Sequence, residues 1–184
     1  MRLDGMRVGV FVAEGVEDLE YWVTVMRLRE EGALVRSIGH TLDGVRGKNG
    51  LAAKPDTLAA DVTVDDVDAL VIPGGWAPDK LRRYRDVTDL VHAVHEAGKP
   101  IGIICHGGLV AISAGIVSGS RATGSLGIKD DLVNAGARWV DEPAFSDGTL
   151  VWGRVVEDIP AFERELVERF AATRATPAPA AARA

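Results

Sequence analysis

The 184-residue sequence has a single cysteine, Cys105, which excludes an internal disulfide framework and any cysteine-rich zinc or iron–sulfur centre. A chain without disulfides is typical of a reducing compartment, so we expect a cytoplasmic protein. Basic residues are also few, because 21 Lys and Arg face 27 Asp and Glu and leave a net charge of −6. Phosphate contacts need a basic face, and we therefore expect no nucleic-acid partner.

Long apolar runs without interruption are scarce as well. The longest uncharged run covers residues 101–120, where five glycines, three serines and His106 interrupt the apolar side chains. This composition suits a buried strand that leads into a helix better than a membrane span. The apolar run at 8–13 is too short for the core of a signal peptide, and acidic residues follow it at once. We expect no membrane partner.

The composition that is present is that of a globular protein, with 47% hydrophobic and 26% charged residues. A chain of this length is typical of one domain that buries about two-thirds of its unfolded surface. We expect this domain to cover residues 1–172. Residues 173–184 are rich in Ala, Pro and Arg and lack an apolar period, which predicts a disordered tail.

Short apolar runs alternate with helical patterns along the chain, which predicts an α/β fold with a mainly parallel central sheet between two helical layers. Strands are expected at 7–12, 34–38, 69–72 and 101–104, with weaker ones at 121–123, 138–140 and 149–152. Helices are expected at 18–31, 86–97, 105–114 and 128–134 and from 158–160 onward, and a loop with small strands at 40–61.

Two of these helices show an apolar stripe that predicts which face packs on the sheet. In the first helix the stripe consists of Leu19, Trp22, Val23 and Met26, and in the second of Val87, Leu90, Val91 and Val94.

Two turn segments follow predicted buried strands, at 73–75 and at 105–108. The carboxyl ends of parallel strands meet at one edge of a sheet, and ligands bind there beside a change in strand order. We therefore expect these two turns to face each other and to form the functional site.

Cys105 lies where a buried strand turns into a helix. Free N–H groups at a helix start favour a thiolate, and the glycines at 107 and 108 allow the tight turn that a nucleophile elbow needs. The alternative is a buried structural cysteine. The turn context favours a nucleophile.

A nucleophilic cysteine usually needs a base, and the four histidines limit the choice. No histidine follows His106, so a triad that takes its histidine downstream of the cysteine is impossible in one chain. His92 and His95 lie off the apolar stripe of their helix, and we expect neither to bind metal. His106 itself is left as the candidate partner.

The backbone N–H groups at Gly74 and Gly75 are candidates to hold an oxyanion, together with the amide that follows Cys105. Acidic residues crowd the end of the first strand. For Glu14 and Asp18 we expect the ordinary role of complementing the dipole of the following helix.

Three motifs resemble the PfpI-like intracellular protease/amidase family: Pro73-Gly-Gly-Trp-Ala-Pro-Asp79, Gly102-Ile-Ile-Cys-His-Gly107 and Gly127-Ile-Lys-Asp-Asp-Leu-Val-Asn-Ala-Gly136. The similarity runs in the family's order from about residue 6 to residue 170. The family belongs to the superfamily of the Parkinson-linked stress protein, with a class I glutamine-amidotransferase-like fold. The resemblance therefore implies a flavodoxin-like sandwich.

The resemblance also implies roles for site residues. Cys105 would be the nucleophile with His106 beside it, Glu20 would hydrogen-bond the sulfur, and Glu17 would lie near the pocket. In family members described as proteases, an acidic residue of a neighbouring subunit completes a triad, and that position falls on Asp79 here. A homodimer or larger homo-oligomer is implied. Asp79 stands where glutamate is common, so its reach is one methylene shorter.

The function implied is a stress-type enzyme that acts on small reactive carbonyl compounds through a Cys105 thiolate, as a glyoxalase III or a deglycase. One alternative is an intracellular cysteine peptidase or amidase with an intersubunit Cys-His-Asp triad and a peptide substrate. An alternative of another class is a redox sensor or chaperone-like binding protein. No cofactor is expected, because the sequence has no phosphate-cradling glycine motif.

Overall fold

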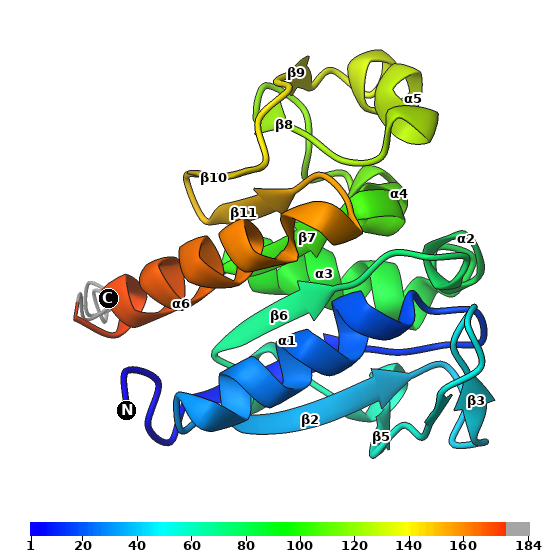
Figure 1. The fold of residues 1–184 in the computed structure, drawn as a ribbon, viewed down its shortest axis with the longest axis vertical. Coiled ribbons are helices and arrows are strands. Elements are labelled where there is room, and N and C mark those ends of the chain that lie inside the picture. Colours follow the sequence, from blue (N-terminus) through cyan, green and yellow to red (C-terminus); the bar gives the residue numbers. More distant parts are fainter. Residues whose placement is uncertain (176–184) are drawn as a thin grey trace, which may run out of the picture.

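The computed structural model describes residues 1–175, which form a central sheet covered by helices on both faces (Figure 1). The seven strands run in the order β10-β11-β7-β6-β1-β2-β5, and all are parallel except β10, which pairs antiparallel with β11. The strands are β1 (Arg7–Phe11), β2 (Leu34–Gly39), β5 (Thr57–Leu58), β6 (Ala69–Ile72), β7 (Ile101–Ile104), β10 (Ala144–Asp147) and β11 (Leu150–Gly153).

Helices α1 (Asp18–Glu30) and α6 (Ile159–Ala175) pack together on one face of the sheet, and α3 (Arg85–Glu96) lies on the other (Figure 1). Shorter helices α2 (Ala77–Leu81), α4 (Gly108–Ser113) and α5 (Lys129–Asn134) connect the strands. Two small pairs lie outside the main sheet, β3 (Val45–Arg46) with β4 (Ala52–Ala53) and β8 (Arg121–Ala122) with β9 (Arg138–Trp139). The expected α/β sandwich with a mainly parallel, flavodoxin-like sheet is confirmed.

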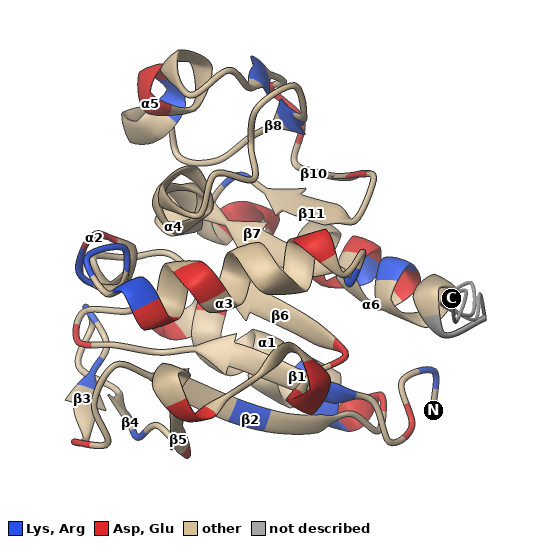
Figure 2. Ribbon diagram, turned by 180° about the vertical axis from the view of Figure 1, so that it is seen from behind, with Lys and Arg blue, Asp and Glu red and all other residues tan. Residues whose placement is uncertain are grey.

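The core is built on the central strands, whose residues are buried on both faces. Strands β6, β7 and β11 contain no charged residue and are drawn entirely in tan in Figure 2. Water does not reach a parallel sheet between two helical layers, so the sequences of these strands are continuous apolar runs. The expected strands at 69–72 and 101–104 match β6 and β7 at both ends.

The predicted apolar face of α3 is confirmed, since Val87, Leu90, Val91 and Val94 are all buried. The predicted face of α1 is only half right, since Trp22 and Val23 are partly buried against the core but the other two members of the stripe are not. Leu19 is 48% exposed and Met26 is 57% exposed, whereas the buried side chains of this helix include Tyr21, Thr24, Val25 and Leu28. The face turned to the interior also carries Glu20. The prediction selected the face with the most apolar residues, and a face that includes a carboxyl group does not stand out by that criterion.

Other boundaries differ at the carboxyl end of the chain. Helix α6 continues to Ala175, past the start of the tail expected at residue 173, and the remaining residues 176–184 lie outside the described part. Strand β10 was not expected, because it is a half-buried edge strand with a mixed sequence. Within residues 1–175, no helix is both long enough and apolar enough to span a bilayer.

Candidate active site

The candidate site lies where the strand order reverses. The chain runs from β1 to β2 on one side and returns to β6 on the other side of β1, so the loops after β1 and β6 diverge there. In open α/β sheets ligands bind beyond the carboxyl ends of the strands at such a point. The turn after β7, which carries Cys105, lies against the turn after β6, since Gly74 closely approaches Cys105, and the two predicted turns are brought together.

Cys105 has a φ angle of +58°, the only positive φ among the described residues other than glycine. A side chain in this left-handed region costs about 1 to 2 kcal/mol, so the surrounding structure must hold it there. The residue opens a short 3-10 helix, Cys105–Gly107, that leads into α4. This is the strained strand-to-helix turn of a nucleophile elbow.

Gly74 allows the approach of the two loops. A Cβ atom at this position would lie 2.7 Å from Cys105 Cβ, 2.7 Å from Glu20 Oε2 and 2.9 Å from the His106 nitrogen. No side chain fits in that space. Gly75 follows with a φ angle of +75°, and it forms an isolated β-bridge with Val16 that ties the loop after β6 to the loop after β1.

Glu20 lies on α1 and is fully buried. The Gly74 N–H donates a 2.7 Å hydrogen bond to its Oε2, and its Oε1 has no hydrogen-bond partner. Burial raises the pKa of Glu20 to about 7, against the lowering effect of the Gly74 N–H. Near neutral pH this carboxyl group therefore exchanges a proton readily, as an acid–base group needs to do.

The Cys105 thiol is 9% exposed and interacts with Glu20. Burial, and next the negative charge of Glu20, raise the pKa of Cys105 to about 12, while the N–H groups of His106 and Gly75 lower it. The expected stabilisation of the thiolate by the turn is present in those two N–H groups. It does not outweigh burial while Glu20 is ionised, because two neighbouring negative charges repel each other.

His106 is half-buried, and its Nδ1 lies 3.3 Å from Cys105 Sγ. Burial, and then the charge of Lys48, lower the pKa of His106. The imidazole is therefore neutral at pH 7 and can accept a proton. Adjacent side chains usually point apart, and the left-handed turn at Cys105 is what lets these two meet.

Glu17 caps the amino end of α1. It is 2% exposed, and its Oε2 accepts a 2.9 Å hydrogen bond from the Glu20 N–H. Its Oε1 accepts a hydrogen bond from Asn49 Nδ2 at 3.2 Å. Glu17 thus holds the turn that carries Glu20, and it contacts the site through that residue.

Glu14 and Asp18 bind a loop. Glu14 Oε2 accepts the N–H of Arg46 at 2.8 Å, and the two oxygens of Asp18 accept the N–H groups of Asn49 at 2.7 Å and Leu51 at 2.8 Å. We predicted that these two carboxylates complement the dipole of the helix, and that prediction did not include these hydrogen bonds to the loop. Sequence gave no sign of them, because the partners are backbone groups more than 30 residues away.

The loop that these acids hold, residues 46–51, also brings a cation near the site. The Lys48 N–H donates to the Val16 carbonyl at 2.8 Å. Burial lowers the pKa of His106 most, and the charge of Lys48 lowers it further. Burial raises the pKa of Glu20, and the charge of Lys48 is the smallest of the effects that oppose it. Sequence reasoning missed Lys48, because a single lysine in a polar loop carries no pattern.

Asp79 lies on α2 and does not contact His106 of its own chain. Its side chain is 59% exposed and forms an ion pair with Arg83. Helix α2 does pack against the 3-10 helix that contains Cys105 and His106. The intersubunit role of Asp79 stays a prediction. Within residues 1–175, no group of three or more His, Cys, Asp or Glu side chains is placed to hold a metal ion.

The fold is a three-layer α/β sandwich with a cysteine on a left-handed turn and a buried carboxyl group beside it, both next to the point where the strand order reverses. These features define a nucleophile-elbow protein. The chain belongs to the DJ-1/PfpI family, whose sequence pattern matches residues 6–169. The resemblance noted in the sequence is confirmed.

Relatives cover nearly the whole chain. Deglycase PfpI of Pyrococcus furiosus is 36% identical over 163 residues, which is 89% of this chain and 98% of that protein. General stress protein 18 of Bacillus subtilis is 37% identical over 167 residues, which is 88% of this chain and 95% of that protein.

A solved structure of a two-domain protein from Anabaena variabilis, containing DJ-1/ThiJ/PfpI-like and ferritin-like domains, superposes with a TM-score of 0.89 and 32% identity. The match covers 97% of this chain and 52% of that protein, so this chain spans about half of the two-domain protein's length.

Proposed function

We propose that this protein is a deglycase-type or glyoxalase III-type enzyme that acts on small reactive carbonyl compounds through Cys105. The observation that carries the proposal is the position of the Cys105 thiol, held on a strained turn between a buried Glu20 and two backbone N–H groups. The deglycase and stress-protein names of the relatives support an enzyme of this kind.

The first step in this proposal is a proton transfer within the Cys105–Glu20 pair. Glu20 accepts the thiol proton, which removes the negative charge that opposed the thiolate and leaves a neutral carboxyl group beside the sulfur. The pair then holds one proton and one negative charge, which its burial tolerates better than two charges.

The thiolate next attacks an aldehyde carbon of the substrate. The carbon–sulfur bond forms and the carbonyl π pair moves to oxygen. The N–H groups of Gly75 and His106, which interact with the sulfur, are the candidates to stabilise the charge that develops on that oxygen. Glu20 returns the proton to the oxygen, and the product is a hemithioacetal.

For a 2-oxoaldehyde such as methylglyoxal, His106 or Glu20 then carries the proton from the hemithioacetal carbon to the neighbouring carbonyl carbon. The hydroxyl proton moves to the oxygen of that carbonyl group, so the first carbon becomes the new carbonyl. This isomerisation gives a thioester of a 2-hydroxy acid, and water releases the acid and restores the thiol. The lowered pKa of His106 fits a base that is neutral before it accepts the proton. No redox partner is consumed, because the aldehyde is oxidised as the ketone is reduced.

The test compares wild-type protein with Cys105→Ser for methylglyoxal loss, lactate formation and release of free amine from a methylglyoxal-treated amino acid. Glu163→Gln serves as a control, since it alters a buried carboxyl group that the mechanism does not use. Activity in wild type and control, with at least about a 1,000-fold loss in Cys105→Ser, supports the proposal. Equal rates in wild type and Cys105→Ser contradict it.

A second candidate is a cysteine peptidase or amidase in which Asp79 of a neighbouring subunit orients His106. The observation that favours it is the exposed position of Asp79 on α2, next to the helix that carries His106. This candidate requires a homodimer or larger oligomer. Hydrolysis of a peptide amide that is lost in Asp79→Asn, with the oligomer intact, supports it over the first.

We place the protein in the cytoplasm, as its single reduced cysteine suggests. Oxidation of Cys105 by peroxide without turnover of any carbonyl substrate would favour the sensor alternative instead, since an accessible thiolate is also the most oxidisable form of cysteine.

A further inference from the structure

The outer edge of β2 is only partly covered. Strand β5 pairs with β2 at Ile38 and Gly39 and no further. The Leu34 N–H and the Ile38 carbonyl point toward β1, to Met6 and Val12. Because successive residues of a strand direct these groups to opposite sides, those of the odd-numbered residues between them point outward.

One of these outward residues is already satisfied. Ser37 donates its N–H to Asp56 Oδ2 at 2.7 Å, and its carbonyl accepts the Asp56 N–H at 2.8 Å. Val35 comes next toward the start of the strand, where no strand lies beside it among the described residues. The N–H and carbonyl of Val35 therefore form the open end of the hydrogen-bonding ladder, and Leu34 beside it is 63% exposed.

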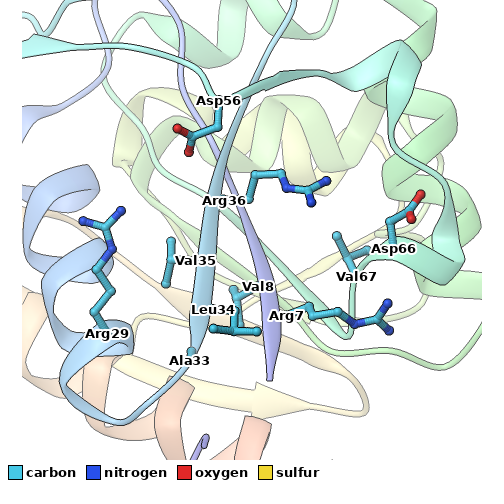
Figure 3. Close-up of a pocket in the computed structure, with 10 residues that line it drawn as sticks. All are labelled: Arg7, Val8, Arg29, Ala33, Leu34, Val35, Arg36, Asp56, Asp66 and Val67. Atoms are coloured by element: carbon cyan, nitrogen blue, oxygen red, sulfur yellow. The ribbon is translucent and has the colours of Figure 1, made fainter. Parts of the chain in front are cut away.

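A hollow of about 580 Å³ surrounds this open edge. Figure 3 shows its lining side chains on both sides of the strand, with Arg29 and Val35 on one side and Arg36 and Arg7 on the other. Lining residues from both faces of a sheet meet only around an uncovered edge. Arg29 and Asp56 also line a second hollow of about 480 Å³, whose lining includes Trp22 and Lys54, so the two hollows adjoin.

The two acidic side chains that line these hollows accept hydrogen bonds from neighbouring residues. Asp56 accepts the Ser37 N–H, and Asp66 accepts hydrogen bonds from the N–H and the hydroxyl of Thr63.

Most of the basic side chains that line these hollows form no ion pair. Arg7 is paired with Asp68, whereas Arg29, Arg36 and Lys54 form no ion pair within residues 1–175. Asp56 and Asp66 keep their negative charges, because their hydrogen-bond donors are neutral N–H and hydroxyl groups. The three unpaired basic side chains outnumber these two carboxylates by one, so the surface is positive in a protein whose net charge is −6. Charge complementarity favours an acidic occupant.

We propose that the edge of β2 at Val35 binds an extended, acidic segment of another protein as an added strand. The backbone of the segment pairs with the N–H and carbonyl of Val35, and its alternating side chains reach Arg29 and Lys54 on one face and Arg36 on the other. This is recognition by strand addition, in which main-chain hydrogen bonds give affinity and side chains give specificity.

The same charges argue against a second copy of this chain as the occupant. Two β2 edges paired through Val35 would bring both sets of uncommitted arginines together, and like charges across an interface disfavour it. The surface lies at the amino ends of β1 and β2, whereas Cys105 follows the carboxyl end of β7. The proposal therefore stands apart from the catalytic one.

The probe is an acetylated and amidated hexapeptide of alternating Glu and Val, added to ¹⁵N-labelled protein at 0.1 M salt. We expect saturable shifts of the backbone amide signals of residues 33–37. A peptide with Lys in place of Glu tests charge, and a Glu/Val peptide with alternate amides methylated tests main-chain pairing. Both are expected to bind more weakly, by about fivefold or more.

The variants Arg29→Ser/Arg36→Ser and Val35→Pro are the protein-side tests, since proline removes the N–H and is tolerated on an edge strand. Each is expected to weaken binding while leaving Cys105 alkylation unchanged, which shows that the fold is intact. The proposal is overturned by an absence of saturable shifts at residues 33–37, or by equal binding of the Lys peptide. Equal binding of the methylated peptide, with inorganic phosphate competing, would reduce the surface to an anion site and also overturn it.

Discussion

At the scale of single residues, the site depends on how Cys105 and Glu20 share a proton. The two groups are buried together, and burial raises the pKa of each. Glu20 raises the pKa of Cys105 further, whereas the hydrogen bond from Cys105 lowers the pKa of Glu20. Such a pair titrates as a unit. The form that holds one proton appears as pH rises through about 7. Within this form the proton moves between the sulfur and Glu20, and the reactive thiolate is present while Glu20 holds the proton.

Replacement of Glu20 should change the shape of the pH profile for thiol reactivity. In wild-type protein the rate of alkylation by iodoacetamide should rise about tenfold per pH unit below pH 7 and level off above it. In Glu20→Gln the thiol titrates alone, so the rate should keep rising above pH 7. Rate constants between pH 5 and pH 10 check this.

Glu163→Gln is the matched control for that measurement and should keep the wild-type profile. A wild-type profile without a change of slope near pH 7 would contradict the shared proton.

Gly74 allows a second prediction at this scale. A Cβ atom there would meet Cys105 Cβ and Glu20 Oε2 at 2.7 Å, so Gly74→Ala must push the two groups apart. We expect a loss of about 1 to 3 kcal/mol in the free energy of unfolding and a slower alkylation of Cys105. Urea denaturation and iodoacetamide kinetics measure both effects.

Gly44→Ala is the control, because a Cβ atom at Gly44 would have the Ala53 carbonyl oxygen, at 3.9 Å, as its nearest neighbour beyond the adjacent residues. Equal stability losses in the two variants would mean that the close approach at Gly74 is not what matters.

At the scale of elements, sequence predicts the buried strands and α3 well and α1 poorly. Strands β6 and β7 are uninterrupted apolar runs, and α3 has all its apolar side chains on one face. In α1, by contrast, Tyr21 and Thr24 are buried while Leu19 is exposed. The face of α1 that packs in the core combines Tyr21, Val25 and Leu28 with the buried Glu20, so these tertiary contacts, which no local pattern encodes, fix its orientation.

The orientation of α1 predicts a contrast between two leucines on the same helix. Leu28 is fully buried, so Leu28→Ala should lower the free energy of unfolding by about 2 to 5 kcal/mol. Leu19 is 48% exposed, and Leu19→Ala should change the free energy of unfolding by about 0.5 kcal/mol or less. Urea denaturation of both variants measures the difference. The reverse ranking would restore the face that the apolar stripe predicts.

The candidate site divides in the same way. Cys105, His106 and the glycines at 74 and 75 follow buried strands, so the topology of a parallel sheet brings them together. Glu20 came from family resemblance, and the structure places it beside the sulfur. The contacts of Glu14, Asp18 and Lys48 with the 46–51 loop arise from long-range folding alone, and the sequence contains no signal for them.

At the scale of the whole molecule, two buried carboxyl groups make stability depend on pH. Glu163 on α6 is 4% exposed and accepts a hydrogen bond from Thr24 on α1. Burial raises its pKa to about 7, against the lowering effects of Thr24 and Arg27. Glu20 has its pKa raised to about 7 by burial as well.

The sign of the effect follows from the raised values. A carboxyl group whose pKa is higher in the folded state binds its proton more tightly there, so its contribution is full below the unfolded pKa near 4.5 and is lost as pH rises through about 7. Wild-type protein should therefore lose unfolding free energy between pH 5 and pH 8. Each carboxyl group contributes up to about 3 kcal/mol.

Glu163→Gln should remove its share of this decline and be more stable than wild type at pH 8. Urea denaturation at pH 5 and pH 8 measures it, with the exposed Glu168→Gln as a control that should keep the full decline. Parallel declines in Glu163→Gln and wild type would show that Glu163 does not carry the effect.

The burial of Glu20 makes stability and reactivity depend on pH in opposite directions. Glu20 loses its proton as the solution becomes alkaline, and it can then act as the base that accepts the thiol proton. The same loss leaves an unsolvated negative charge inside the protein. A sample should keep longest in mildly acidic buffer, where it reacts slowly, and should work fastest in buffers that shorten its shelf life.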